Sequence, residues 1–198
     1  MSHHQSHHQS HHQSHHQSHH QSHHQSHHQK TNLYTSTLAT PLGYMQAVCD
    51  DEGILYLNWQ QDKPIDNDYD NDVSRETCVQ LKDYLSGKRQ AFTIPVSDKS
   101  VSQAMRRWLD VMQKIPYGQT ISYRAFAAMW GNPKAARAAG GACQKNPLPI
   151  IFPCHRVIGG NGTYDRYSGG DHSTPDNPAN IARKKALLDL EAGLHVIL

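Results

Sequence analysis

The stretch TISYRAFAAMWGNPKAARAAGGACQKN, residues 120–146, contains two short segments of helical character separated by a turn. Ser122 stands where a cap of the first helix is expected, and Gly131 stands at the end of that helix. Asn132 is expected to cap the second helix, with Pro133 at its first position. Two short helices joined by a tight, glycine-containing turn are typical of a helix-turn-helix, which we predict over these residues.

The second predicted helix has very few long side chains. It consists mainly of alanine and glycine, and Lys134 and Arg137 are the exceptions in its first two turns. One interpretation is a helix that packs closely in a core. The other is a helix that brings its backbone close to DNA. Recognition in the major groove uses side chains such as Asn, Gln and Arg to read base edges. A helix without them fits the minor groove better, with Arg137 available to enter the base stack.

The residues before this stretch predict a small sheet and two longer helices. Apolar and polar residues alternate over 35–57, and the alternation breaks at 50–53, which indicates a β-hairpin. Apolar residues recur at helical spacing over 73–85, followed by Gly87 as a stop signal, and again over 105–112. We therefore predict a fold of the α/β (α+β) class. A small N-terminal antiparallel sheet with a helix precedes a helical, winged helix-turn-helix-like C-terminal domain.

Composition divides the 198 residues into three parts. Residues 1–29 repeat the unit Ser-His-His-Gln and hold 14 of the 17 histidines. They carry no apolar residue after Met1, so we expect a disordered tail, either an engineered tag or a natural repeat. The predicted N-terminal domain, 30–97, has six basic and ten acidic residues, and the C-terminal domain, 98–198, has thirteen basic and seven acidic residues. A basic C-terminal half indicates nucleic-acid binding, and the alternative is ordinary scatter of surface charge.

The four cysteines are Cys49, Cys78, Cys143 and Cys154. They form no Cys-x-x-Cys pair and no spacing typical of zinc ligands, so no metal site is expected. The sequence shows no secretory signal and no apolar run of ~18 residues, the usual minimum for a membrane span. These features predict free thiols and a cytoplasmic protein that does not enter a membrane.

The segment IIFPCHRVIGG, residues 150–160, places a cysteine between a proline and a histidine. The preceding LPIIF, residues 148–152, is interpreted as a buried strand. Cys154 at its end is either a small core residue or a nucleophile. The adjacent His155 and Arg156 favour the second interpretation, because a histidine beside the thiol can take its proton and leave a thiolate.

Several of these motifs together resemble the O6-alkylguanine-DNA alkyltransferases. They are GNPKAARAAGGA (131–142), NPLPII (146–151), PCHRV (153–157), YSGG (167–170) and ARKKALLDLEAG (182–193), and QLKDYLSGKRQAF (80–92) is similar to the end of the family's N-terminal domain. The resemblance implies a methylated-DNA–[protein]-cysteine S-methyltransferase. Such a protein transfers the alkyl group of O6-alkylguanine in double-stranded DNA to Cys154, once per molecule. It binds the minor groove and flips the base, and it needs no cofactor. We expect a cytoplasmic monomer, associated with the nucleoid if the source is bacterial.

The resemblance also assigns roles to individual residues. Cys154 is the implied nucleophile, which His155 activates through water while Glu191 orients the histidine and Asn146 braces the turn. Tyr123 is implied to press on a phosphate and to donate a proton to the guanine. Arg137 fills the gap left by the flipped base. The further implied contacts are Arg124, Asn132, Ala135 and Gly160 with DNA, and Val157, Tyr167 and Ser168 with the substrate base.

Three features depart from the family pattern. Arg166, preceded by Asp165, stands directly before Tyr167 where glycine or asparagine is usual, and the insertion DHSTPDNPANI, residues 171–181, follows YSGG. The third is Ala104, where phenylalanine is usual, with the tryptophan of the same predicted helix shifted to Trp108. We interpret the insertion as a surface loop. Asp165 and Arg166 either narrow the pocket, so that methyl is accepted better than benzyl, or pair with each other at the surface. An alternative function is a non-catalytic alkylguanine-recognition protein that flags lesions for another repair pathway, and the presence of Cys154 argues against it.

Overall fold

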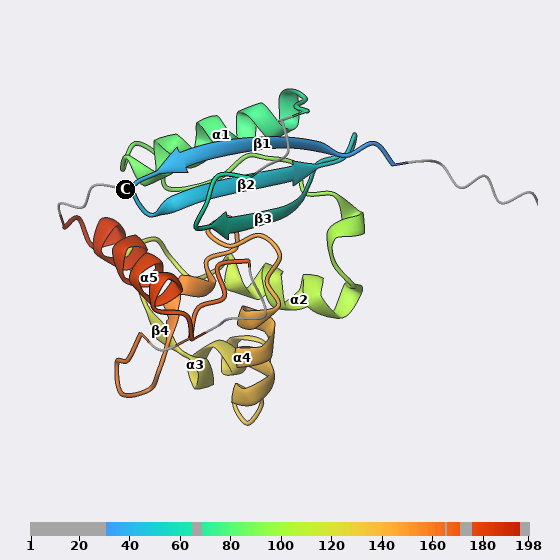
Figure 1. Ribbon diagram of the computed structural model, residues 1–198. Helices are drawn as coiled ribbons and strands as arrows, with labels where there is room; N and C mark the ends of the chain where they lie inside the picture. The colour runs from blue at the N-terminus through green and yellow to red at the C-terminus, as the bar shows by residue number, and fades with distance from the viewer. Residues whose placement is uncertain (1–30, 65–68, 165, 171–175, 195–198) are drawn as a thin grey trace, which may run out of the picture. The chain divides into compact units, whose positions relative to one another are not determined.

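An antiparallel sheet of three strands, in the order β1-β2-β3, forms the first part of the fold (Figure 1). The computed structural model describes residues 31–64, 69–164, 166–170 and 176–194. The strands are Tyr34–Thr40 (β1), Gly43–Cys49 (β2) and Ile54–Gln60 (β3). The register runs from Tyr34↔Cys49 to Thr40↔Gly43 and from Tyr44↔Gln60 to Cys49↔Ile54, with a shift between Val48 and Cys49. The predicted hairpin is confirmed, because its turn occupies residues 50–53.

Helix α1, Asp72–Leu85, covers one face of this sheet (Figure 1). Asn71 caps it by accepting a hydrogen bond from the Ser74 backbone, and the Ser74 hydroxyl accepts one from the Asn71 backbone. Leu81 and Tyr84 are completely buried against the sheet and the rest of the core. Gly87 follows the helix with a φ of 74°, a conformation that glycine adopts without strain. The helix predicted over 73–85 and its stop signal are therefore confirmed.

The predicted helix-turn-helix is present as α3, Tyr123–Met129, and α4, Ala136–Gln144. It follows a short 3-10 helix, Asp98–Ser100 (η1), and α2, Gln103–Met112. Ser122 caps α3 as expected, by accepting a hydrogen bond from the Ala125 backbone at 3.1 Å. The expectation for Asn132 is wrong, since α4 begins three residues after Pro133. The Asn132 side chain instead accepts a hydrogen bond from the Lys134 backbone at 3.0 Å and closes the turn itself.

The segment 147–153 is a buried turn, so the strand predicted over 148–152 is wrong. Apolar composition alone does not separate a strand from another buried segment. Phe152 donates its backbone N–H to the Leu148 carbonyl at 2.9 Å, which reverses the chain. Ile150 within the turn has a φ of 75°, which is rare for a β-branched residue. The turn leads into the 3-10 helix Cys154–Arg156 (η2) and strand β5, Val157–Ile158, which pairs in parallel with β4, Ile121–Ser122.

Helix α5, Pro178–Glu191, completes the described fold. Asn177 caps it by accepting a hydrogen bond from the Ala179 backbone at 2.9 Å. Residues 178–181 of the insertion therefore belong to a helix, and the prediction of a loop is wrong for them, while 171–175 lie outside the described residues. No helix in the described part of the chain is long and apolar enough to cross a membrane.

The edge of β3 joins the sheet to the segments that follow the helix-turn-helix. Leu57 donates its backbone N–H to the Pro147 carbonyl at 2.8 Å, and Trp59 donates to the Gly169 carbonyl at 2.9 Å. The described residues from Thr31 onward accordingly belong to one compact unit. The division into an N-terminal domain 30–97 and a C-terminal domain 98–198 stays a prediction, and the predicted tail 1–29 lies outside the described residues.

Candidate active site

Cys154 follows the buried turn, and Asn146 binds the backbone at both ends of that turn. The Asn146 Nδ2 donates to the Phe152 carbonyl at 2.8 Å, and its Oδ1 accepts from the Leu148 backbone at 3.0 Å. Asn146 is completely buried, so water does not compete for these bonds. The amide therefore braces the turn that presents the Cys154 thiol.

His155 points to a buried carboxylate on the last helix. Its Nε2 lies 2.6 Å from the Glu191 Oε1. Arg156 donates from Nε to Glu191 Oε2 at 2.8 Å, the Gly118 backbone donates to the same oxygen at 3.0 Å, and the Tyr84 hydroxyl donates to Oε1. Glu191 thus collects donors from α1, from the segment after α2 and from η2.

These contacts determine the protonation of the pair. Burial raises the pKa of Glu191, but hydrogen bonds and charge from His155, and bonds from Arg156 and Tyr84, outweigh burial and lower the pKa to about 2. Burial lowers the pKa of His155, and this exceeds the opposite effect of Glu191. The histidine is therefore a neutral imidazole at neutral pH, and its positive charge acts on Glu191 only in the acidic range in which that carboxyl titrates. Since Nε2 donates its proton to the carboxylate, Nδ1 carries the lone pair, and it has no protein hydrogen-bond partner among the described residues.

The Cys154 thiol is protonated in the resting protein. Burial raises its pKa, while the Asn146 amide and the positive charge of Lys184 act in the opposite direction without compensating. A buried thiol with a raised pKa becomes a nucleophile only when a base removes its proton. The residue that follows Cys154 in the chain is the neutral His155, whose Nδ1 lone pair has the chemistry of such a base.

A cavity of about 440 Å³ opens above Cys154, next to the helix-turn-helix. Its size falls within the range of small-molecule sites, ~300–1,000 Å³. Tyr123 from α3 and Arg137 from α4 line one side of the cavity, and Tyr167 and Ser168 line it from the segment before the insertion. Helices α3 and α4 approach closely here, since a Cβ at Gly140 would lie 4.0 Å from two Tyr123 ring atoms.

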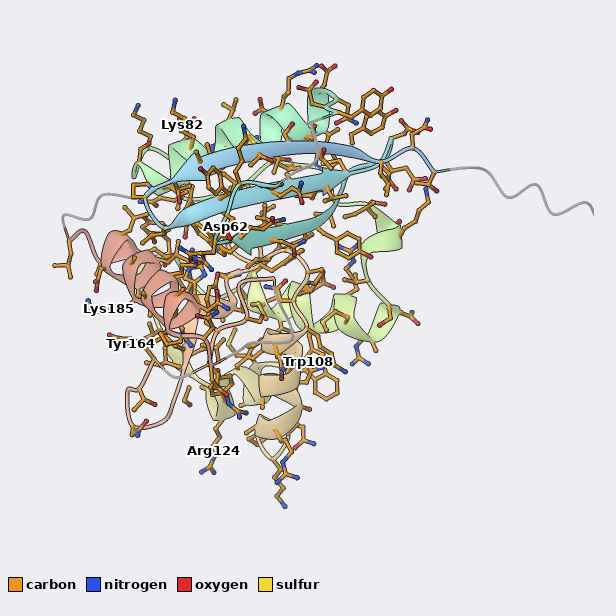
Figure 2. All side chains as sticks on the ribbon, viewed as in Figure 1. Asp62, Lys82, Trp108, Arg124, Tyr164 and Lys185 are labelled. Carbon is orange, nitrogen blue, oxygen red and sulfur yellow. The ribbon has the colours of Figure 1, made fainter. Side chains whose placement is uncertain are left out.

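Four further residues implied to contact DNA lie outside the cavity lining. Arg124 is exposed and projects from α3 away from the sheet, as Figure 2 shows. Asn132 is exposed in the turn between the two helices, and Ala135 is half-buried directly before α4. Gly160 is exposed in the loop after β5. Arg124, Asn132 and Ala135 thus belong to the helix-turn-helix that carries Tyr123 and Arg137 of the cavity lining, whereas Gly160 lies in a separate loop.

The residues implied to hold the substrate base do not all line the cavity. Ser168 lines the cavity, and its hydroxyl donates to the Gln144 carbonyl at 2.9 Å. Val157 is buried, and the described cavity lining does not include it. Its carbonyl instead accepts a hydrogen bond from Lys184 Nζ at 2.8 Å.

Sequence reasoning missed Lys184 and the role of Arg156. Lys184 is completely buried on α5 and also donates to the Arg166 carbonyl at 3.4 Å. A signal was present, because Lys184 shares a helical face with Leu187, Leu188 and Glu191. Arg156 was noted only as a neighbour of Cys154, whereas its guanidinium binds Glu191 twice and the Ile115 carbonyl once, at 2.6 Å.

Arg166 lines the cavity with a mostly exposed side chain. Its Nε lies 3.4 Å from Asp176 Oδ1, and each side chain is 69% exposed. Asp165, the partner considered from the sequence, lies outside the described residues. The observed partner therefore comes from the insertion before α5.

Fold and site define a class: a helix-turn-helix protein with a buried thiol beneath a cavity and a histidine–glutamate pair that follows it. The chain matches the models of two families, "6-O-methylguanine DNA methyltransferase, ribonuclease-like domain" over residues 33–97 and "6-O-methylguanine DNA methyltransferase, DNA binding domain" over residues 103–193. The chain belongs to the 6-O-methylguanine DNA methyltransferase family.

Individual relatives agree with this assignment. The constitutive methylated-DNA–protein-cysteine methyltransferase of Bacillus subtilis is 37% identical over 158 residues, covering 76% of this chain and 95% of that protein. The crystal structure of Mycobacterium tuberculosis O6-methylguanine methyltransferase has a TM-score of 0.65 at 27% identity, covering 83% of this chain and 96% of the other. A structure of the Mycobacterium tuberculosis protein in complex with DNA has a TM-score of 0.64 at 31% identity, covering 79% and 91%.

Proposed function

We propose that this protein repairs O6-alkylguanine in double-stranded DNA by transferring the alkyl group, in the first place methyl, to Cys154. The observation that carries the proposal is the thiol beneath the cavity, next to a neutral histidine whose Nε2 proton is held by Glu191. Family membership supports the same reaction. The substrate is chromosomal DNA, which is the basis for expecting the protein in the cytoplasm and, in a bacterium, at the nucleoid.

The reaction is a displacement at the alkyl carbon. His155 Nδ1 takes the Cys154 proton through a water molecule, and the thiolate attacks the methyl carbon as the bond to guanine O6 breaks. The guanine leaves as an anion, and Tyr123 at the cavity wall donates a proton to it. A proton then passes from the His155 imidazolium to the Tyr123 phenolate through water, which restores both side chains. In the net reaction the thiol proton replaces the methyl group on guanine, and the charges balance. A thioether remains on Cys154, so each molecule acts once.

Binding to the minor groove with base flipping explains the form of α4. A nucleotide has to leave the duplex before its O6 group can reach a buried thiol. Arg137 stands at the cavity mouth on an exposed helix face, where its guanidinium is placed to fill the gap in the base stack. The small side chains of α4 let the backbone approach the groove. We propose that one monomer performs the whole reaction, since one chain supplies Cys154, His155, Glu191 and Arg137.

Intact-mass measurement tests the reaction. The protein is mixed with an excess of a duplex that contains one O6-methylguanine, and the expected result is a mass gain of one methyl group on Cys154 that does not increase further. The matched control is Cys154→Ser, which should bind the duplex and gain no mass. Binding of the lesion by the unaltered protein without a mass gain would instead support the non-catalytic recognition protein.

A further inference from the structure

Arg166 occupies the cavity wall in a backbone conformation that favours glycine. Its φ is 59°, in the left-handed region. Its carbonyl accepts a hydrogen bond from the buried Lys184 Nζ, which also binds the Val157 carbonyl and thereby fixes the backbone at this point. The side chain leaves this fixed backbone toward solvent, with 69% of its surface exposed.

The described charges at the cavity mouth are positive. Arg137 and Arg166 both line the cavity, and no described lining residue carries a carboxylate. The carboxylate of Asp176 reaches Arg166 from outside the lining, with its Oδ1 3.4 Å from the Arg166 Nε. Water screens an ion pair that is this exposed, so it holds the guanidinium only weakly.

The position of Asp176 is set by the start of α5. Asp176 directly precedes the capping residue Asn177. In the first turn of the helix, Asn180 Nδ2 donates to the Ser168 carbonyl at 3.2 Å, which ties this helix end to the cavity wall. The carboxylate is therefore held next to the rim, where a phosphate of a bound DNA strand would compete with it for Arg166.

We propose that Arg166 binds a DNA phosphate beside the extruded nucleotide, and that Asp176 holds its guanidinium in the free protein and gives way to that phosphate. This proposal rests on the proposed function, because it requires a nucleotide that enters the cavity. The phosphates on either side of such a nucleotide pass the mouth that Arg137 and Arg166 flank. A guanidinium binds phosphate through two parallel, charge-assisted hydrogen bonds, whereas the ion pair with Asp176 is 3.4 Å long and exposed to water.

Salt-dependent DNA binding tests the role of Arg166. Affinity for a duplex with one O6-methylguanine is measured over a range of salt concentrations in the full chain with Cys154→Ser, which prevents transfer. Arg166→Ala should weaken binding about three- to tenfold at low salt and reduce the salt slope by about one. Arg166→Lys should retain the slope. The control is Arg75→Ala on α1, another exposed arginine paired with Asp70 and Asp72 but distant from α3 and α4 (Figure 1).

Asp176→Asn tests whether Asp176 and a DNA phosphate compete for Arg166. It should raise affinity about two- to fivefold when Arg166 is present, as expected for release from an exposed ion pair, and have no effect in Arg166→Ala. An equal gain in both backgrounds, or an unchanged salt slope in Arg166→Ala, would overturn the proposal. In protein that retains Cys154, an effect of Arg166→Ala that is confined to benzyl transfer would also overturn the proposal, because Arg166 would then limit the width of the pocket. Methyl transfer by protein that retains Cys154 is followed separately, and its absence would refute the proposed function itself.

Discussion

Replacing Glu191 by glutamine removes one negative charge from a site that four donors share. The pKa of this carboxyl is lowered from 4.5 to about 2, which corresponds to roughly 3 kcal/mol of native-state stabilisation of the charged form at ~1.4 kcal/mol per pKa unit. The side chain is completely buried, so solvent does not screen this contribution. Glutamine keeps the shape of glutamate and leaves the Arg156 guanidinium buried without its counter-charge. We expect Glu191→Gln to lower the free energy of unfolding by roughly 3 kcal/mol.

Denaturant titration at neutral pH measures this loss directly. In a thermal scan, the same loss lowers the melting temperature by roughly 6–12 °C for a chain of this size. The contribution has a defined pH dependence, because the folded-state pKa lies below that of the unfolded chain. It is fully present above about pH 4.5 and is lost as the pH falls toward 2, so the difference between variant and parent should shrink over that range.

The same substitution should slow methyl transfer. Glutamine offers one uncharged amide oxygen in place of two carboxylate oxygens, so His155 must compete for it with Tyr84, Gly118 and Arg156. The tautomer with a free Nδ1 is then no longer enforced. Loss of a general base typically costs about 10²–10⁴ in rate, and we expect at least about 10² in single-turnover experiments.

Glu76→Gln provides the matched control. Glu76 is exposed on α1 and accepts a hydrogen bond from Gln80, which an amide oxygen can also accept. Its stability should change by no more than ~0.5 kcal/mol, with an unchanged rate of transfer. If Glu191→Gln also stays within about 1 kcal/mol of the parent and reacts at the parental rate, the assignment of Glu191 as the partner of His155 is refuted.

The site makes three further predictions. The rate of methyl transfer should fall on acidification with a midpoint below pH 6.5, because burial disfavours the charged imidazole of His155. Single-turnover rates between about pH 5 and 8 measure this midpoint, and a value above 6.5 would contradict a neutral base. Asn146→Ala should lower the free energy of unfolding by ~2–3 kcal/mol in denaturant titration, since it leaves the Phe152 carbonyl and the Leu148 N–H without the Asn146 amide as partner. A loss below ~0.5 kcal/mol would show that the turn does not need this amide. Arg137→Ala should reduce the fluorescence of a base analogue that reports extrusion more than it reduces overall DNA affinity, and an equal reduction of both would make Arg137 a general DNA contact.

The same Asn-Pro pair stands in two different structures. Asn177 caps α5 and Pro178 is its first residue, although we predict a loop there from the sequence. At Asn132 and Pro133 the side chain closes a turn with Lys134, and α4 begins only at Ala136. Asparagine stabilises both arrangements through the same type of hydrogen bond, so the local sequence does not distinguish them.

In the site, residues that are neighbours in sequence could be predicted, whereas a partner distant in sequence could not be found from the residues alone. Cys154 and His155 are neighbours in sequence, and their chemistry could be suggested from the residues alone. Glu191 could be assigned only from the resemblance, because 36 positions separate it from His155. The turn before Cys154 escaped sequence reasoning because Ile150 adopts a positive φ that β-branched residues rarely have. Tertiary contacts, such as the bond from Leu57 to Pro147, accompany that conformation.

We expect the carboxylate shared by α1, the segment after α2, η2 and α5 to decide also when the thiol becomes reactive during synthesis. A growing chain exposes its residues from the N-terminus onward, so Cys154 emerges before the helix that carries Glu191. Until α5 docks, His155 has no buried carboxylate to fix its tautomer, and the cysteine behaves as an ordinary thiol. A nascent or truncated chain that ends before residue 191 should therefore not consume alkylated DNA. The protein's single reaction is reserved for molecules that have folded to the end of their last helix.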